Sequence, residues 1–486
     1  MAPEEPDETV IDAATAPDFG DEPTRVSEGG ESESLDKENR LKADYVRRVR
    51  EALDEGERDQ VYDLVEPLHP ADIADLFELL GADERPLLAD AITDLMSADV
   101  IAEMNDHVRE QIVEELDAED IAEIAEQLDT DDAVAMLEDL DEADQQAVLA
   151  EMEPEDRAAI ESALSFPEES AGRLMSRDFV AVPEHMTVGD LIDYLRESRQ
   201  LATEFWEVFI VDARHHPIGT CLLSWILRAP RSVALADVMK RDQTLIPVTM
   251  DQEEVALRFQ KYALISAAVV DESGRLVGQI TVDDVVHIIQ EEAGEDALLL
   301  SGAGDGDINE PLPQTIRTRM WWLFINLGTA ILASSVVALF EGTITRLVTL
   351  AVLMPIVTGM GGNAATQTMT VTVRALATNQ LTSANSWRMI VREWWIASAN
   401  GWGLGVLMAI ACQLIYHDWW LSFVLLLAMI LNSLNAGLSG VLIPIGLNRL
   451  KIDPAVTSTV FVTTMTDTLG FFFFLGLADL FRLSAS

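Results

Sequence analysis

The last apolar run of the chain, Pro454–Leu477, contains one charged residue, Asp467. An ionisable side chain at membrane depth is costly, so it faces a bundle interior or a water path and marks a functional site. No basic residue within the apolar runs is an obvious partner, which leaves a mobile cation as the simplest one; a structural polar contact is the alternative. Hydroxyl groups on the same segment come from Thr459, Thr463, Thr464 and Thr466.

The available ligands are oxygen atoms, because the apolar runs hold no cluster of His, Cys or Met. Oxygen ligands suit a hard cation such as Mg²⁺, or Ca²⁺ or Mn²⁺, rather than copper or zinc. Mg²⁺ gives up its water reluctantly, and one carboxylate per chain is too few to strip it. A pore that holds the hydrated ion is therefore the easier design, and two chains around one axis would double the carboxylates.

A second run, Leu347–Val373, is long enough to span a bilayer but has the composition of a poor membrane helix. Pro355 removes a backbone hydrogen bond, and Asn363 and Gln367 bring amides into the run. Irregular backbone at membrane depth is tolerated only where it is buried in protein or lines a water-filled path. We expect a pore-lining bend from Gly359 to Asn363 beside Asp467, with close helix packing as the alternative use of the glycines.

Five apolar runs predict five membrane spans. They are Trp321–Phe340, Leu347–Val373, Trp394–Tyr416, Trp419–Asn448 and Pro454–Leu477. Tryptophans at several run ends match an interfacial belt, and most of the flanking Arg and Lys fall on one side if the N-terminus is inside. We therefore expect a multi-pass protein of a bacterial inner membrane, with the N-terminus and acidic domains cytoplasmic and the C-terminus outside.

The net charge is -52, and nearly all of the acidic excess precedes residue 320. A field of this sign favours cations as ligands and argues against nucleic acid, although solubility explains part of it. Cys221 and Cys412 imply no disulfide framework. Residues 1–40 are expected to be disordered, and the acidic N-terminus has no apolar segment typical of a signal peptide.

Repeats organise the acidic part. Three related segments predict an α-superhelix over residues 41–166, with an Asp near each start suited to a helix N-cap. They are Leu68–Leu80, Leu116–Leu128 and Leu128–Leu140. Most acids of these helices are expected on a solvated outer face.

A longer repeat, with a spacing of 64 residues, follows as β-α-β-β-α units over 167–232 and 233–288. These units resemble paired cystathionine-β-synthase (CBS) domains, which often bind adenosine nucleotides. The nucleotide signature of that family is present in the second copy as Gly278, Thr281 and Asp284, which implies ATP there. The first copy has Gly219, Leu222 and Trp225 instead, so one site is lost.

The order of these parts, with an acidic connecting helix and linker at 289–316 and a pore domain at 317–486, resembles the MgtE family of magnesium channels and transporters. Two motifs carry the resemblance: Pro355, Gly359, Gly361, Gly362, Asn363 and Gln367 in the second run, and Thr463, Thr464, Asp467 and Gly470 in the last.

The resemblance implies an all-α pore domain in a homodimer, with a pore on the two-fold axis and a plug formed by the connecting helix. It places the pore ion at Asp467, Asn363 and Thr463, beside Gly359, Gly361 and Gly362. Cytosolic Mg²⁺ would close the pore by bridging regulatory acids. The matching positions are Asp251, Glu253, Asp284, Glu292, Glu295, Asp296 and Asp453.

Three residues depart from the family pattern: Ala263, His287 and Ala365. The first two put the number of regulatory sites in doubt, but not the pore. Two other functions stay open. One is a membrane-anchored CBS nucleotide sensor, which needs no acid inside the membrane. The other is a proton- or sodium-coupled divalent cation exchanger, which ordinarily needs a second titratable group in the spans. No nucleophile and base pair points to an enzyme.

Overall fold

The computed structural model describes residues 34–114, 116–138, 140–198, 205–300 and 309–483. Most of the head that we expected to be disordered, and much of the expected Gly- and Pro-rich linker, lie outside these residues. The chain divides into two compact units, Met1–Glu115 and Leu116–Ser486, which are described separately.

The first unit is helical around one apolar core. Large residues of this core, including Leu76, Phe77 and Leu88, are fully buried. Its helices are α1 (Ala43–Glu55), α2 (Arg58–Val65), α3 (Pro70–Leu79), α4 (Arg85–Ala91), η1 (Thr93–Leu95), α5 (Ala98–Ala102) and α6 (Asp106–Val113).

The second unit opens with four more short helices. They are α7 (Ala118–Ala125), α8 (Thr130–Glu138), α9 (Glu142–Glu151) and α10 (Pro154–Leu164). The expected helical repeats are therefore present, but two of the Asp residues expected as caps make no capping hydrogen bond. Asp117 occupies the N-cap of α7 without a side-chain hydrogen bond, and Asp72 lies in the first turn of α3, whose cap is His69. These acids therefore act on the helix dipoles more than on individual N–H groups.

Two small sheets confirm the predicted duplicated α/β unit. CBS copy 1 contains β1 (Ala181–Pro183), α11 (Val188–Glu197), β2 (Glu207–Val211), β3 (Pro217–Leu222), α12 (Leu223–Ile226) and α13 (Leu235–Val238). CBS copy 2 contains β4 (Leu245–Pro247), α14 (Gln252–Tyr262), β5 (Ser266–Val270) and β6 (Leu276–Thr281). In each sheet the first strand pairs parallel to the second, which pairs antiparallel to the third.

The segment before the first strand of each CBS copy packs on the other copy. Ser176, which precedes β1, exchanges backbone hydrogen bonds of 2.9 Å with Gln279 of copy 2. Lys240, which precedes β4, bonds in the same way to Thr220 of copy 1. This exchange ties the copies together and brings Gly278 against Met175 and Gly219 against Met239.

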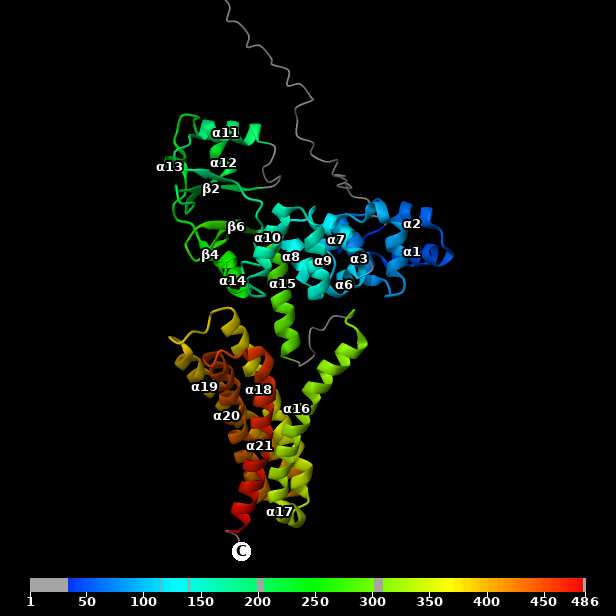
Figure 1. Cartoon of the computed structure of the whole chain (residues 1–486). Helices are drawn as coiled ribbons and strands as arrows, with labels where there is room; N and C mark the ends of the chain where they lie inside the picture. The colour runs from blue at the N-terminus through cyan, green and yellow to red at the C-terminus, as the bar shows by residue number, and fades with distance from the viewer. Residues whose placement is uncertain (1–33, 115, 139, 199–204, 301–308, 484–486) are drawn as a thin grey trace, which may run out of the picture. The chain divides into compact units, whose positions relative to one another are not determined.

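Helix α15 (Val282–Leu299) follows β6 directly and crosses the expected domain boundary at residue 288 without a break. Val285 and Ile288 are buried in the core of CBS copy 2. At the other end, Leu299 and Leu300 pack against the membrane helices, and the Thr459 hydroxyl donates to the Leu300 carbonyl at 2.7 Å. One helix thus connects CBS copy 2 to the membrane bundle (Figure 1).

The C-terminal part is an all-helical bundle (Figure 1). Its helices are α16 (Leu312–Leu339), α17 (Glu341–Arg346), α18 (Thr349–Ala377), α19 (Ser386–Tyr416), α20 (Trp419–Arg449) and α21 (Pro454–Leu483). Within the described residues, four stretches are long and apolar enough to cross a membrane: α16, α19, α20 and Thr459–Phe481 of α21. Helix α18 is long enough but more polar, so the count of five spans stays a prediction.

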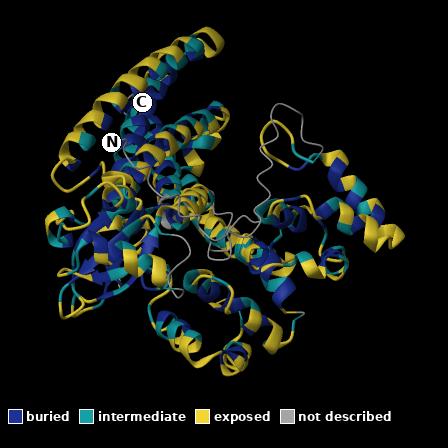
Figure 2. Cartoon of the chain, turned by 90° about the horizontal axis from the view of Figure 1, so that it is seen from above, coloured by how far each residue is buried: buried dark blue, intermediate teal, exposed yellow. Residues whose placement is uncertain are grey.

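Exposure differs sharply among these helices, as Figure 2 shows by colour. Helix α20 is the central one, because 16 of its residues are buried. Only Ala333 is buried in α16, whose outer side carries Trp321, Leu323 and Phe324. A lipid-facing helix has this pattern.

The expected bend in the second span is not found, because α18 is one uninterrupted helix with Pro355 inside it. Pro355 lies in the second turn, where it removes only the hydrogen bond to the Ala351 carbonyl. A membrane helix keeps its remaining backbone bonds because lipid offers no replacement. The glycines of α18 therefore act through the space that they leave, which the next section describes.

The glycine packing in the CBS copies yields a stability prediction. A Cβ on Gly278 would lie 2.8 Å from the Met175 sulfur and 2.9 Å from the Ser176 carbonyl oxygen, so Gly278→Ala forces the backbone apart. We expect a loss of about 1–3 kcal/mol in unfolding free energy, measured by thermal unfolding of the full chain.

Gly294→Ala is the matched control, because nothing lies within 4 Å of a Cβ at this helical position. It should be neutral or stabilising by up to about 1 kcal/mol. Equal effects at the two glycines would contradict the packing argument.

Candidate functional site

Helix α18 carries polar residues on an exposed face of a membrane bundle. Gly359, Asn363, Thr366, Gln367 and Thr370 recur at helical spacing, and all five are exposed. The Thr366 hydroxyl donates to the Gly362 carbonyl at 3.1 Å, which leaves its lone pairs available. Amides and hydroxyls do not face lipid, so this face belongs against water or a second chain.

Asp467 lies on α21, which packs against α18. It is half-buried, and among the described residues it has no hydrogen bond or ion pair. One turn earlier the Thr463 hydroxyl donates to the Thr459 carbonyl at 2.8 Å, and Thr464 donates to Val460 at 2.6 Å. Both hydroxyl protons are used in hydrogen bonds to backbone carbonyls. The hydroxyl oxygens therefore present only acceptor lone pairs, beside a carboxyl group that has no hydrogen-bond partner among the described residues.

The four predicted pore positions on α18 separate into two groups. Gly359 and Asn363 are exposed and Gly362 is partly so, whereas Gly361 is buried. Gly361 lies against the amide of Asn432 on α20, and no motif had marked that residue. An Asn in an apolar run gives no sequence signal of which neighbour it contacts.

A second acid in the bundle was also missed as a site. Glu393 of α19 is buried, with 6% of its surface exposed, and it accepts a hydrogen bond of 3.2 Å from the Thr368 hydroxyl of α18. It has no basic partner within the described residues. In the sequence Glu393 stands just outside an apolar run, beside Trp394, and so resembles a residue of the membrane surface.

A first group of acids lies between the helical repeats and CBS copy 2. Burial, with the nearby carboxylates of Asp178, Asp132 and Asp284, raises the pKa of Asp129 to about 6. Burial and the charge of Asp284 also raise the pKa of Asp131 well above its ordinary value. Burial is the larger cause of both shifts, and the neighbouring carboxylates add a mutual repulsion when all are ionised.

We call Asp129, Asp131, Asp132, Asp178 and Asp284 the upper acid cluster. Of these five, only Asp284 was predicted as a regulatory residue. The others look like ordinary first-turn or loop acids in the sequence, and only the fold brings them together.

A second group of acids lies where CBS copy 2 and α15 approach the membrane helices. Asp251 at the N-cap of α14, Glu253 in its first turn and Asp453 before α21 line one cavity of about 490 Å³. Desolvation and the charges of Glu292, Glu169 and Asp453 raise the pKa of Glu295. The Gln252 amide donates to Glu292 at 2.8 Å.

The structure thus gathers most of the predicted regulatory residues in this lower acid cluster. Its members are Asp251, Glu253, Glu292, Glu295 and Asp453. The predicted Asp296 lies on α15, but its side chain is outside the described set. Within the described residues, no three acids, histidines or cysteines are already arranged to hold a metal ion. These acids would therefore bind a cation only by moving toward one another or through its water.

The predicted nucleotide residues are occupied by contacts within the protein. The Thr281 hydroxyl and N–H both donate to one oxygen of Asp284, at 2.7 and 3.2 Å. Burial raises the pKa of Asp284 despite these bonds. Met175 packs directly against Gly278, as described above. Contacts within the protein therefore account for these three residues of the signature without a nucleotide.

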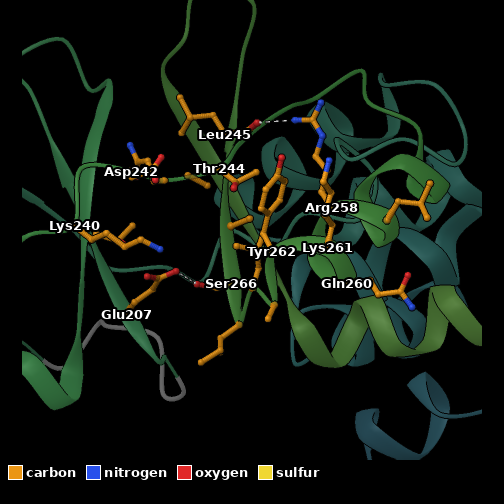
Figure 3. Close-up of a pocket in the computed structure, with 18 of the residues that line it drawn as sticks. Glu207, Lys240, Asp242, Thr244, Leu245, Arg258, Gln260, Lys261, Tyr262 and Ser266 are labelled. Carbon is orange, nitrogen blue, oxygen red and sulfur yellow. Dashed lines mark hydrogen bonds between the residues drawn. The ribbon is translucent and has the colours of Figure 1, made fainter. Parts of the chain in front are cut away.

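The large open cleft between the CBS copies is a different place. It measures about 1320 Å³ and is lined by Leu222 and Trp225 of the lost first signature, but not by Thr281 or Asp284. Figure 3 shows Lys240 and Glu207 on one side of the cleft and Tyr262, the last residue of α14, on the other. The Ser266 hydroxyl closes one side by donating to Glu207 at 2.6 Å.

Comparison with known proteins agrees with this architecture. Three family models match: a divalent cation transporter domain, MgtE, at residues 354–477; the MgtE intracellular N domain at 68–169; and a CBS domain at 235–291. A solved structure of the cytosolic domain of the Mg²⁺ channel MgtE in complex with ATP is 29% identical, with a TM-score of 0.46. It covers 50% of this chain and 99% of that one.

Two curated relatives are both called magnesium transporter MgtE. The protein from Bacillus subtilis is 29% identical, and the match covers 66% of this chain and 72% of the relative. The protein from Thermus thermophilus is 32% identical over 331 residues, again with 66% of this chain and 72% of the relative covered. With its helical N domain, CBS pair and all-helical membrane part, this chain belongs to the MgtE family of divalent cation transporters.

Proposed function

We propose that this protein conducts Mg²⁺ across a membrane through a pore lined by α18 and α21, and that cytosolic Mg²⁺ closes the pore. The observation that carries the proposal is the exposed polar face of α18 beside Asp467, an acid with no protein partner among the described residues. The relatives named magnesium transporters support Mg²⁺ as the transported ion.

The ion site consists of Asp467, Asn363 and Thr463, with Gly359 and Gly362 giving the ion room to approach the backbone. Oxygen ligands and a single carboxylate favour a hydrated Mg²⁺, since this ion keeps several waters. Gly361 contributes indirectly, because its contact is Asn432.

A homodimer supplies what one chain lacks. An exposed polar face on a membrane helix needs a partner other than lipid. Two copies of the α18 face around an axis would enclose a polar path and place two Asp467 carboxylates beside it. The whole assembly belongs in a bacterial inner membrane, with the acidic domains in the cytoplasm and the C-terminus outside.

Gating follows from repulsion within the two acid clusters. Without cations, ionised carboxylates drive the surrounding elements apart; Mg²⁺ neutralises them and favours the compact, closed form. Helix α15 is suited to transmit this change, because it leaves CBS copy 2 and ends against Thr459 of α21. ATP at Gly278, Thr281 and Asp284 of CBS copy 2 stays a further proposal; without a nucleotide, the Thr281 hydroxyl donates to Asp284.

Replacing the acid of the ion site tests conduction. Asp467→Ala removes the carboxylate without adding volume, and we expect Mg²⁺ uptake into proteoliposomes to fall to the protein-free background. Asp479→Asn is the control on the same helix, because Asp479 accepts a hydrogen bond from Thr343 and has no place in the proposed site. Normal uptake by the Asp467 variant would remove the basis of the pore assignment.

The upper acid cluster predicts how stability depends on pH. The pKa of Asp129 is raised to about 6 in the folded protein. A carboxyl with a raised pKa binds protons more strongly when folded, so stability falls as pH rises through this value. In Mg²⁺-free buffer the full-length protein should unfold several degrees higher at pH 5.5 than at pH 7.5, and saturating Mg²⁺ should reduce that difference.

Asp129→Asn should flatten the dependence on both pH and Mg²⁺, whereas Asp144→Asn, on the exposed side of α9, should leave both unchanged. If Asp129→Asn keeps the full pH dependence of stability, then repulsion among these carboxylates is not its cause.

A cation exchanger is the second candidate, and Glu393 is the observation that favours it. Exchange coupled to protons ordinarily needs a second titratable group in the bundle, and Glu393 is buried there against Thr368. For a channel, Glu393→Gln keeps an oxygen for Thr368 and should conduct Mg²⁺ at the wild-type rate, with no internal pH change in either protein. Proton movement that accompanies Mg²⁺ uptake and disappears in Glu393→Gln would instead establish exchange.

A further inference from the structure

Asn432 lies at the centre of the membrane bundle, between the two helices assigned to the pore. Its side chain on α20 is 1% exposed. The Nδ2 group donates to the Val357 carbonyl of α18 at 2.8 Å. A carbonyl only accepts, so the NH₂ group of the amide is the one that faces the Val357 carbonyl.

Two glycines make room for this amide. A Cβ on Gly361 of α18 would lie 2.1 Å from Nδ2 of Asn432. A Cβ on Gly470 of α21 would lie 3.1 Å from both Nδ2 and Oδ1. The Asn432 side chain therefore occupies the space that a missing side chain leaves on each helix.

These two glycines belong to the segments that carry the proposed ion ligands. Gly361 is two residues before Asn363, and Gly470 is three residues after Asp467, which is nearly one turn of α21. The bond to Val357 fixes α18 along its axis, one turn before Gly361. The single amide of Asn432 thus fixes the relative positions of Asn363 and Asp467 along the axes of their helices.

Ordinary core packing does not explain an amide here. Among the described residues, Oδ1 of Asn432 is buried and has no hydrogen-bond partner. An unpaired buried acceptor is destabilising, because it has lost its hydrogen bonds to water without gaining others. A Leu of similar shape would avoid that cost, so the position gains something that an apolar side chain does not supply.

We propose that Asn432 is a positioning residue of the ion pathway: its amide wedges between Gly361 and Gly470 and sets the register of Asn363 against Asp467. The inference rests on the proposed function, since it concerns the site assigned there. Asn432 itself lies behind the polar face of α18 and does not touch the ion.

The test measures Mg²⁺ and Co²⁺ uptake by the full-length protein in proteoliposomes. Asn432→Leu keeps the shape and removes the amide. We expect Mg²⁺ flux to fall about tenfold to a hundredfold, as for misplaced groups in other functional sites, and the ratio of Mg²⁺ to Co²⁺ flux to change. Ser433→Ala, a buried neighbour that faces Gly401 of α19, is the matched control and should change neither.

A double variant separates register from steric fit. Gly361→Ala alone should impair flux, because its methyl group displaces the amide. Combining it with Asn432→Ala relieves the overlap but leaves the Val357 bond missing, so the defect of Asn432→Ala should persist. Full recovery in the double variant would reduce Asn432 to a packing residue and overturn the proposal.

Two further outcomes decide the matter. Wild-type flux and ion ratio in Asn432→Leu would overturn the proposal, as would a lower flux with an unchanged ratio, which indicates a purely structural role. If Asn432→Leu does not fold, Asn432→Ala decides by the same two readouts. Asp467→Ala is measured in parallel: if it conducts, the proposed pore fails, whereas an inactive Asp467→Ala with a normal Asn432→Leu refutes only the present inference.

Discussion

A carboxylate inside a bilayer needs a compensating charge or water, and the membrane part of this protein depends on that requirement. Asp467 finds no cationic side chain among the described residues, and the threonines before it offer only acceptor lone pairs. The exposed polar face of α18 meets the same need from the neighbouring helix. A bundle built in this way is incomplete as a single chain in lipid, and a cation with its water is the component that fits it.

The part of the chain before the membrane helices also depends on electrostatics. There, several carboxylates lie near one another, and burial together with the charges of their neighbours raises the pKa values of Asp129, Asp131 and Glu295. No preformed chelate exists among the described residues. Loose clusters of this kind respond to a cation over a range of concentration rather than holding it permanently, which suits a sensor better than a structural metal site.

How far the sequence predicts this structure depends on whether a residue contrasts with its neighbours. Asp467 and Asn363 stand out in apolar runs, and the CBS copies are visible as a repeat. The role of Asp129 cannot be predicted from the sequence, because dozens of other acids occur in similar sequence surroundings. Only the tertiary structure brings Asp178 and Asp284 close to it. Asn432 and Glu393 were not predicted for a related reason: their burial and their contacts, rather than their residue types, distinguish them.

The glycine motif of α18 shows why a motif is not one site. Its residues stand on a continuous helix, so neighbours in sequence face different directions: Gly359 and Asn363 face outward, and Gly361 faces α20. A bend is not needed to expose a path, since a helix already presents one face to the pore and another to the bundle. In the proposed pore, the outward glycines would leave room beside the ion path, whereas the inward Gly361 lies against Asn432 of α20. Selection for ion passage would act on both, through entirely different contacts.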